Sequence, residues 1–498
     1  MIKKNFEALL QIQEKMKSFS FEYSGIDFWP FLRMVIGYKE NLKVPQISAQ
    51  EIQKYKTKHT FKQKLGLSLL FFRQYRAIKK VSFKRIKSID ALEGADILYF
   101  SHVLHMKMRD GEEVNVWTSP ILKILQKHYS FRQQTLIITE DGSRGEINEA
   151  LQYINKRYFR TRGIEYFFSA LGIDRFGINE MNGMKELIAE LEQSPLGVTI
   201  TMGTMYERIG LMACKIQFFK KLFRAKKPRA IFLYSFYMDS YLAIVYAARS
   251  LGIPVIEIQH GLIKPWHFAY SHWNQSERKS IFFLPDYCLT HDEETARLIN
   301  ETSGQHTQAH YIGNFNLIEE LRQRKEHTQT LLSKEDPKEE HILVTTSGND
   351  FLPAELSAAI AADSKYIWHI KLHPRYTLDT LYARYKTTFT GSNVRIYYNE
   401  NVSVYDFFQL CKVHITENSY VAIEAEAAGL KNIIIGDLGR DAFADQIEKG
   451  IYYTCLSETD IHDTLSDHTI FEKNKNSSYP DNAEERFLNF YKKTILKK

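Results

Sequence analysis

Short apolar runs alternate with helical patterns along most of the chain. A first series of buried strands is predicted at residues 95–100, 135–139, 198–201, 230–234 and 255–258. A second series is predicted at residues 287–290, 310–312, 342–345, 366–370, 394–398, 413–416 and 432–435. Continuous apolar strands separated by helices are typical of parallel sheets covered on both faces. The pattern therefore predicts an α/β protein with two Rossmann-like, doubly wound domains.

Domain boundaries follow from the two series. We expect a helical region at 1–90, a first α/β domain at 91–285 and a second at 286–480, with ligands bound at the carboxyl ends of strands in a cleft between the domains. The final segment, 481–498, has the apolar spacing of a helix and is expected to pack across both domains. A length of 498 residues fits more than one core, because single cores rarely exceed about 250–300 residues.

Composition narrows the class of protein. The chain is 44% apolar and 25% charged, which is typical of globular proteins. Four widely spaced cysteines form no CxxC pair, so neither a disulfide framework nor a zinc site is expected, and a reducing cytoplasm suits them. The N-terminus lacks the apolar core of a secretory signal, and no transmembrane helix is predicted.

The net charge of +7 is local. Residues 54–87 contain twelve Lys and Arg and no acid, and the rest of the chain has 54 basic and 59 acidic residues. Because this segment also contains apolar residues, we expect it to dock on an anionic membrane surface, which would make the protein peripheral on the inner face of the cytoplasmic membrane. A solvated basic helix pair is the alternative. No nucleic-acid partner is expected, because no RNA-reading motif accompanies the charge.

Several common chemistries are absent from the sequence. It contains no phosphate-binding GxxxxGK[ST] loop, no GxGxxG, GxSxG or HExxH motif, and no DxD pair. We therefore expect no metal ion and no cofactor, and candidate sites are sought among polar residues that directly follow apolar strands.

Two histidine motifs meet this criterion. Gln259, His260 and Gly261 follow the strand at 255–258, and a histidine there can serve as a base or hydrogen-bond donor. A loop histidine that merely ends the strand is the alternative. The second motif follows the strand at 366–370 and could hold a phosphate group with charge-assisted hydrogen bonds; a plain loop is its alternative. Its residues are Lys371, His373, Pro374 and Arg375.

Two further turns could bind an anion. The turn of Glu417, Asn418 and Ser419 precedes a predicted helix, whose first amides favour phosphate, and Glu424 could reach a ribose hydroxyl. A capped helix without a ligand is the alternative. Residues Ser347 and Gly348 form a similar turn after the strand at 342–345.

An acidic turn is a second candidate for the base. Glu140 and Asp141 precede Gly142 after the strand at 135–139, and a carboxylate there could deprotonate a hydroxyl nucleophile. An ordinary surface turn is the alternative.

Four motifs, taken in order along the chain, resemble those of a two-domain GT-B glycosyltransferase of bacterial surface-polysaccharide assembly. They are EDG (140–142), QHG (259–261), KLHPR (371–375) and TENSYVAIEAEAAG (416–429). The resemblance covers residues 95 to 480. It is shared by capsule Kdo transferases, by sialyltransferases with an HP motif and an acid-Asp-Gly motif, and by teichoic-acid glycerophosphotransferases with HG and HP histidines. All three groups use cytidine-nucleotide donors.

The resemblance implies a role for each motif. It places His373 and Ser419 at the donor phosphate, Lys371 and Pro374 at the cytosine, and Glu424 near the ribose. The base would be Asp141 in the sialyltransferase-like reading and His260 in the glycerophosphotransferase-like reading.

We therefore expect a metal-independent inverting glycosyltransferase that moves a nonulosonate or Kdo-type sugar from a CMP donor to a glycan or lipid-linked glycan acceptor. A CDP-alditol phosphotransferase is one alternative. A non-catalytic nucleic-acid or scaffold protein bound through residues 54–87 is another.

Overall fold

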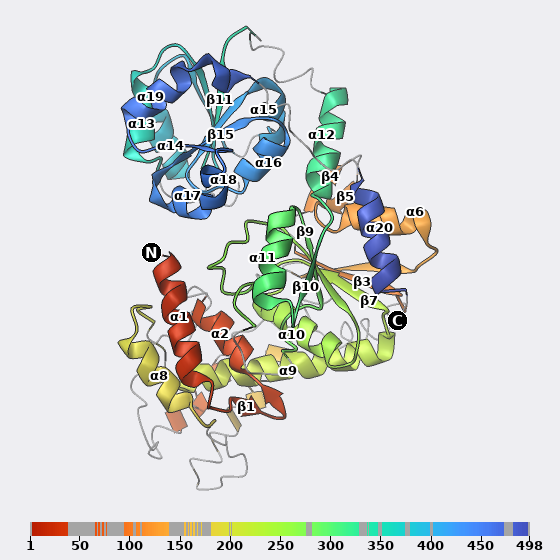
Figure 1. Cartoon of the computed structure of the whole chain (residues 1–498). Coiled ribbons are helices and arrows are strands. Elements are labelled where there is room, and N and C mark those ends of the chain that lie inside the picture. Colours follow the sequence, from red (N-terminus) through yellow and green to blue (C-terminus); the bar gives the residue numbers. More distant parts are fainter. Residues whose placement is uncertain are drawn as a thin grey trace. The chain divides into compact units, whose positions relative to one another are not determined.

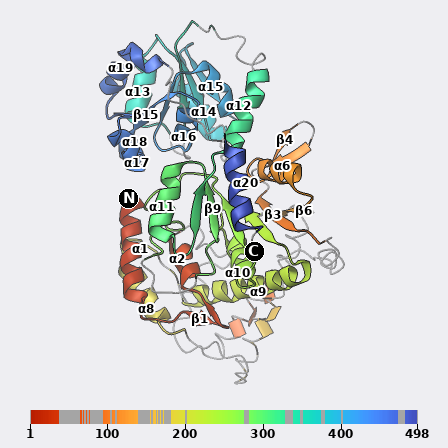
Figure 2. The same ribbon diagram turned by 45° about the vertical axis from the view of Figure 1, so that its right-hand side comes forward.

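The computed structural model describes residues 2–37, 94–102, 106–109, 112–138, 181–198, 200, 202–274, 281–327, 336, 338–346, 351–373, 379–398, 402–472 and 482–496, with isolated residues at 65–76 and 154–171. Contacts divide the chain into a first unit, Met1–Ile312 with Glu484–Lys498, and a second unit, Gly313–Ala483. Figures 1 and 2 show the helices and strands of each unit.

The first unit is built on a six-stranded parallel sheet in the order β10-β9-β8-β7-β3-β6. Every residue of β7, β8 and β9 is buried, as expected for strands covered on both faces. The strands are β3 Ile97–His102, β6 Gln133–Ile138, β7 Ala230–Leu233, β8 Val255–Ile258, β9 Tyr287–Thr290 and β10 Gln308–Tyr311. Its helices are α6 Ser119–His128, α8 Met184–Gln193, α9 Met202–Lys226, α10 Asp239–Arg249 and α11 Glu293–Ser303, and an antiparallel hairpin joins β4 Met106–Arg109 to β5 Glu112–Asn115.

The N-terminal region joins the core of the first unit. It consists of α1 Ile2–Met16, a short hairpin of β1 Glu22–Tyr23 and β2 Ile26–Asp27, and α2 Trp29–Gly37. Figure 1 shows α1 beside α8, and apolar residues of α1, α2 and α8 belong to one hydrophobic cluster with the sheet. The helices α1 and α2 lie within the helical region predicted at 1–90, whereas the hairpin was not predicted.

The last helix, α20 Ala483–Thr494, lies beside strands of the first unit (Figure 2). Phe487 contacts Phe232 of β7, and Phe490 contacts Tyr287 of β9, with ring centroids 6.4 and 5.4 Å apart. The predicted helix is therefore present, and these contacts place it on the first sheet.

The second unit has a six-stranded parallel sheet in the order β13-β12-β11-β14-β15-β16. Its strands are β11 His341–Thr345, β12 Ile367–Lys371, β13 Val394–Tyr397, β14 Val413–Thr416, β15 Lys431–Ile435 and β16 Tyr453–Cys455. Its helices are α12 Phe315–His327, α13 Ala354–Ala362, α14 Asp379–Thr388, α15 Val404–Leu410, α16 Val421–Ala427, α17 Gly436–Ala442, α18 Ala444–Glu448 and α19 Glu458–Ser466, followed by the 3₁₀ turn η4 His468–Phe471.

The predicted fold class is confirmed by these two parallel sheets: the chain has two Rossmann-like α/β domains, and helices precede the first sheet. The predicted boundary at residue 286 is wrong, because β9 and β10 extend the first sheet and the units divide after Ile312. The strand predicted at 198–201 is also wrong at its described residues, Val198 and Ile200, which lie in irregular chain. The predicted cleft between the domains stays a prediction.

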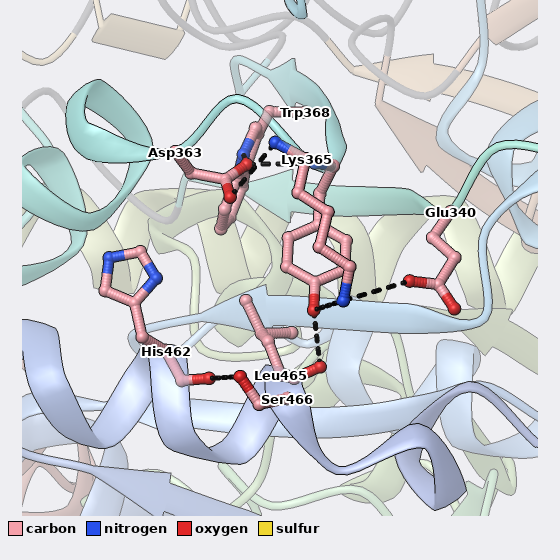
Figure 3. A network of polar contacts seen from close by, with 8 residues as sticks. Glu340, Asp363, Lys365, Trp368, His462, Leu465 and Ser466 are labelled. Atoms are coloured by element: carbon pink, nitrogen blue, oxygen red, sulfur yellow. Dashed lines mark hydrogen bonds and ion pairs between the residues drawn. The ribbon is translucent and has the colours of Figure 1, made fainter.

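A polar network fixes the amino end of β12 (Figure 3). Asp363 Oδ2 accepts hydrogen bonds from Trp368 Nε1 at 2.8 Å and from the Tyr366 amide at 3.0 Å. The Tyr366 hydroxyl donates to the Leu465 carbonyl at 2.6 Å and accepts from Lys365 Nζ at 2.8 Å. These bonds tie β12 to α19 at the edge opposite the carboxyl ends of the strands, so they serve the fold.

Candidate functional site

The strand orders identify the edge of each sheet at which a ligand site is expected. The chain reverses its direction of winding between β3 and β7 in the first sheet, and between β11 and β14 in the second. Open α/β sheets bind ligands beyond the carboxyl ends of strands at such a reversal. Three predicted motifs follow strands at these edges, after β8, β12 and β14. Six predicted site residues lie outside the described residues and stay predictions: Glu140, Asp141, Ser347, Gly348, Pro374 and Arg375.

His260 directly follows β8 and is held by hydroxyl groups. Its Nε2 lies 2.7 Å from Ser235 Oγ and 3.2 Å from the Tyr237 hydroxyl. The rings of Tyr234 and Tyr237 lie 5.8 and 6.0 Å from the imidazole. Ser235 and Tyr237 both follow β7, the strand that pairs with β8. Side chains from the ends of two neighbouring strands therefore meet at one imidazole nitrogen. Hydroxyl groups thus lie within hydrogen-bond reach of this imidazole nitrogen, which is the reach that a general base needs to a hydroxyl proton.

Ser235 adopts a strained backbone. Its φ is +53°, in the left-handed region, and the side chain is buried. A residue with a Cβ pays about 1–2 kcal/mol in this region. The bend lies between the end of β7 and the start of α10, and it sets the Ser235 hydroxyl against His260.

Glu257 supports the same bend from inside β8. Its side chain is fully buried, and its Oε1 accepts from the Phe236 amide at 3.3 Å and from the Tyr270 hydroxyl at 2.6 Å. Its Oε2 has no hydrogen-bond partner within the described residues. Burial raises the pKa of Glu257 to about 8, although hydrogen bonds from Tyr270, Phe236 and Ser235 oppose the shift. The carboxyl group is therefore mostly protonated at neutral pH.

Gln259, predicted as a further residue of the site, is buried and connects the chain after β8 to the chain after β9. Its Nε2 donates to the Gly261 carbonyl at 2.9 Å, and its Oε1 accepts from the His291 amide at 2.8 Å. Open space surrounds the position that a Cβ would take at Gly261. Gln259 thus shapes the loop that carries His260, while the open space leaves room beside Gly261.

An aromatic pair lies beyond the end of β9. The rings of Trp117 and His291 stack, with centroids 5.5 Å apart and planes 21° apart. Burial lowers the pKa of His291 to about 3, with a weaker opposing effect of its hydrogen bond to Gln259. His291 is therefore neutral at physiological pH and contributes an apolar stack to this edge.

The loop after Gly261 is fixed by a buried cation. Arg33 of α2 donates to the Ser271 carbonyl at 2.6 Å, and its guanidinium lies 3.8 Å from the centre of the Trp273 ring. Burial lowers the pKa of Arg33 to about 9. The N-terminal region therefore holds the segment that supplies Tyr270 to Glu257.

In the second unit, β11, β12 and β14 end side by side. Thr345 pairs in register with Lys371 and with Thr416. The Thr346 hydroxyl accepts from the His373 amide at 3.0 Å, and the Thr346 amide donates to the Lys371 carbonyl at 3.3 Å. These bonds fix the start of the Lys371–His373 motif beside the reversal point.

The turn before α16 is the second polar element at this edge. Thr416 Oγ1 donates to the Thr345 carbonyl at 2.9 Å and accepts from the Ser419 amide at 3.3 Å. Ser419 Oγ accepts from the Val421 amide at 3.3 Å. Asn418 Oδ1 is buried without a hydrogen-bond partner among the described residues. The Glu417 carbonyl lies only 2.0 Å from where a Cβ would stand on Gly439, so α17 packs directly against this turn.

Glu424, predicted near the ribose, lies in the interior of the second unit. Its side chain is 5% exposed, and Oε1 accepts from the Tyr405 hydroxyl at 2.9 Å and from Asn314 Nδ2 at 3.2 Å. These bonds tie α16 to α15 and to the start of α12. The contacts give Glu424 a structural role, and its contact with a ribose stays a prediction.

Sequence reasoning missed Ser235, Tyr237 and Glu257. The first two could have been found from the sequence, because the hydroxyl-bearing residues Ser235 and Tyr237 interrupt the apolar run 230–238 just after β7 ends. For Glu257, the signal was an acid inside the buried strand VIEI. Its hydrogen-bond partners come from the bend after β7 and from the later loop, and no local pattern reveals them.

The described residues contain neither a metal-binding cluster nor a helix able to span a membrane. No group of three or more His, Cys, Asp or Glu is arranged to hold a metal ion. Within the same residues, no helix combines the length and apolar character needed to cross a bilayer.

Comparisons with known proteins found similarity in solved structures only. No family model and no curated protein matches the chain. A UDP-GlcNAc 2-epimerase from Neisseria meningitidis bound to UDP-GlcNAc is 12% identical, with a TM-score of 0.47 over 80% of this chain and 100% of that chain. A putative UDP-N-acetylglucosamine 2-epimerase from Listeria monocytogenes is 12% identical, with a TM-score of 0.48 over 81% of this chain and 98% of that one. MurG from Acinetobacter baumannii is 13% identical, with a TM-score of 0.42 over 80% and 99% of the two chains.

Proposed function

We propose that the protein is an inverting glycosyltransferase that moves a nonulosonate or Kdo-type sugar from a CMP donor to a growing capsule or lipopolysaccharide glycan. The observation that carries the proposal is the placement of His260, at the carboxyl end of β8 with Nε2 2.7 Å from a buried serine hydroxyl. The second unit supports it with Lys371, His373 and Asn418 at the carboxyl ends of β12 and β14. In this proposal, the first sheet supplies the base and the second sheet supplies the groups that hold the donor phosphate.

The chemistry divides between these two edges. His260 takes the proton of the acceptor hydroxyl while the hydroxyl oxygen bonds to the anomeric carbon of the donor sugar. The bond between that carbon and the phosphate oxygen breaks, and the configuration at the carbon is inverted. Lys371 and His373 stabilise the negative charge on the phosphate of the departing cytidylate. In this mechanism these side chains take the place of a metal ion. Asp141 is the alternative base, as the acid-Asp-Gly turn of the sialyltransferase-like reading.

The second candidate function is transfer of an alditol phosphate from a CDP donor. It is favoured by the two histidines, His260 before a glycine and His373 before a proline, at the carboxyl ends of β8 and β12. In that reaction, the acceptor oxygen would attack phosphorus and release CMP. Under either function, we propose that residues 54–87 bring the enzyme to anionic lipid and hence to a lipid-linked acceptor.

Nucleotide binding tests the donor class. We expect CMP to raise the melting temperature more than CDP, UDP or GDP does, because a ligand at 100 times its Kd stabilises the native state by about 2.7 kcal/mol. For a domain of this size, that corresponds to a shift of about 5–10 °C. Lys371→Ala should reduce the shift, whereas the matched control Lys338→Ala, an exposed lysine before β11, should keep it. A preference for UDP or GDP would contradict the cytidine donor.

A further inference from the structure

The bend after β7 has an unusual combination of features. Ser235 is a non-glycine residue with φ +53°, its side chain is buried, and its hydroxyl lies 2.7 Å from His260 Nε2. A glycine would adopt this backbone without strain but could not supply the hydroxyl. Compared with glycine, serine therefore adds a hydroxyl group at this position.

A second serine of the first unit provides a comparison. Ser24 has the same φ of +53° in the exposed turn between β1 and β2, followed by Gly25 at φ +73°. Two successive positive φ values are what a tight hairpin turn requires. The strain at Ser24 is therefore explained by the turn alone, whereas Ser235 also bonds to an imidazole.

We propose that Ser235 is a positioning residue: it holds the imidazole of His260, and Glu257 holds Ser235 by fixing the amide of Phe236. This inference rests on the proposed function, in which His260 is the base. In the resting enzyme, the Ser235 hydroxyl and the Tyr237 hydroxyl both face Nε2. The Ser235 contact, the shorter of the two, sets the orientation of the ring before the acceptor binds. The acceptor hydroxyl then takes the place of both hydroxyls at the one lone pair of Nε2, and its proton is transferred to that lone pair.

Glu257 is suited to hold the bend because it is itself immobile. It lies inside β8, its Oε1 bonds to Phe236 N and to the Tyr270 hydroxyl, and Tyr270 belongs to the loop that Arg33 fixes. The ring of Tyr270 also contacts those of Phe236 and Tyr237, with centroids 5.3 and 5.8 Å apart. The bend is therefore fixed on both sides, by a carboxyl group and by aromatic packing.

Chemical modification of His260 tests the contact without any substrate. Diethyl pyrocarbonate acylates neutral imidazole nitrogen, and mass spectrometry of the peptides gives the rate at each histidine. We expect Ser235→Gly to accelerate acylation of His260 at least about threefold, because Nε2 loses its nearest partner. Ser24→Gly, the same substitution at the same φ, should leave that rate unchanged. Equal rates at His260 in the wild type and in Ser235→Gly would overturn the proposal.

Two further variants separate positioning from general loosening. Glu257→Gln keeps an oxygen that accepts from the Phe236 amide and should leave acylation of His260 as in the wild type, whereas Glu257→Leu should accelerate it as Ser235→Gly does. Ser235→Gly should melt within about 2 °C of the wild type, because relief of strain offsets the lost hydrogen bond. Identical acylation in Glu257→Leu and wild type would remove Glu257 from the proposal.

Turnover distinguishes this inference from the proposed function. If a donor is turned over, Ser235→Gly should lower kcat at least tenfold and leave the KM for the donor within about twofold. If no cytidine donor is turned over, the proposed function fails, and the acylation rates still decide whether Ser235 holds His260. Faster acylation with an unchanged kcat would show the contact but contradict its role in positioning the base.

Discussion

Replacing His260 with alanine is expected to lower kcat for nucleotide release by about 10²–10⁴-fold, the range typical of a positioned general base. The KM for the donor should stay within about threefold, because the predicted donor-binding groups belong to the second unit. The reason is geometric: the imidazole follows β8 and Nε2 faces the hydroxyls of Ser235 and Tyr237. Steady-state release of free nucleotide measures the effect, with transfer to water as the readout until the acceptor is identified.

Two controls make this result specific. His128→Ala removes an exposed histidine that bonds to Glu484 on α20 and should leave kcat unchanged. Asp141→Ala tests the alternative base and should lower kcat by less than tenfold if His260 is the base. A tenfold or larger loss in Asp141→Ala alone would transfer the role to Asp141, and a smaller loss in both variants would exclude both residues.

Replacing Glu257 with glutamine is expected to raise the free energy of unfolding, with an effect that grows with pH. Burial raises the pKa of Glu257 to about 8 from the ordinary 4.5, so the folded state keeps a proton that the unfolded state releases. The stabilising effect of that proton is complete below about pH 4.5 and is lost as the pH rises to about 8. At 1.36 kcal/mol for each of about 3.5 pKa units, the loss approaches about 5 kcal/mol above pH 8. Glutamine avoids it, because its amide does not ionise.

Urea unfolding at pH 5 and pH 8 measures this difference. We expect Glu257→Gln to be within about 1 kcal/mol of the wild type at pH 5 and several kcal/mol more stable at pH 8. Glu186→Gln, an exposed acid on α8, should change stability by less than about 0.5 kcal/mol at either pH. An equal gain for Glu257→Gln at both pH values would show that the carboxyl group is not kept protonated by burial.

Periodicity in the sequence was sufficient to predict the fold class but not the domain boundary. Buried strands such as β8 and β14 are short, apolar and flanked by turn residues, so their position is a local property. Membership of a sheet is not local: Tyr287–Thr290 has the same pattern as strands of either sheet, and it joins the first one by pairing with β8. The boundary at residue 286 was wrong for that reason.

The candidate site shows a similar limit. The positions of His260 and His373 just beyond strand ends could be predicted from the apolar runs that precede them, whereas their role in a site stays a prediction. The hydroxyl partner of His260 could not be predicted, since Ser235 follows the neighbouring strand β7, and the sequence does not reveal that its φ is positive. The contacts of Glu424, which lies within α16, could not be predicted either, because Tyr405 and Asn314 belong to other parts of the second unit.

The most direct test of the central proposal is nucleotide release from four donors, CMP-sialate, CMP-Kdo, CDP-glycerol and UDP-GlcNAc, with and without EDTA. We expect free CMP from one of the CMP-sugars, at a rate that EDTA leaves unchanged and that His260→Ala lowers at least tenfold. Release of CMP from CDP-glycerol alone would favour the phosphotransferase. Turnover of UDP-GlcNAc alone, or a rate that EDTA abolishes, would contradict a metal-independent transferase with a CMP-sugar donor.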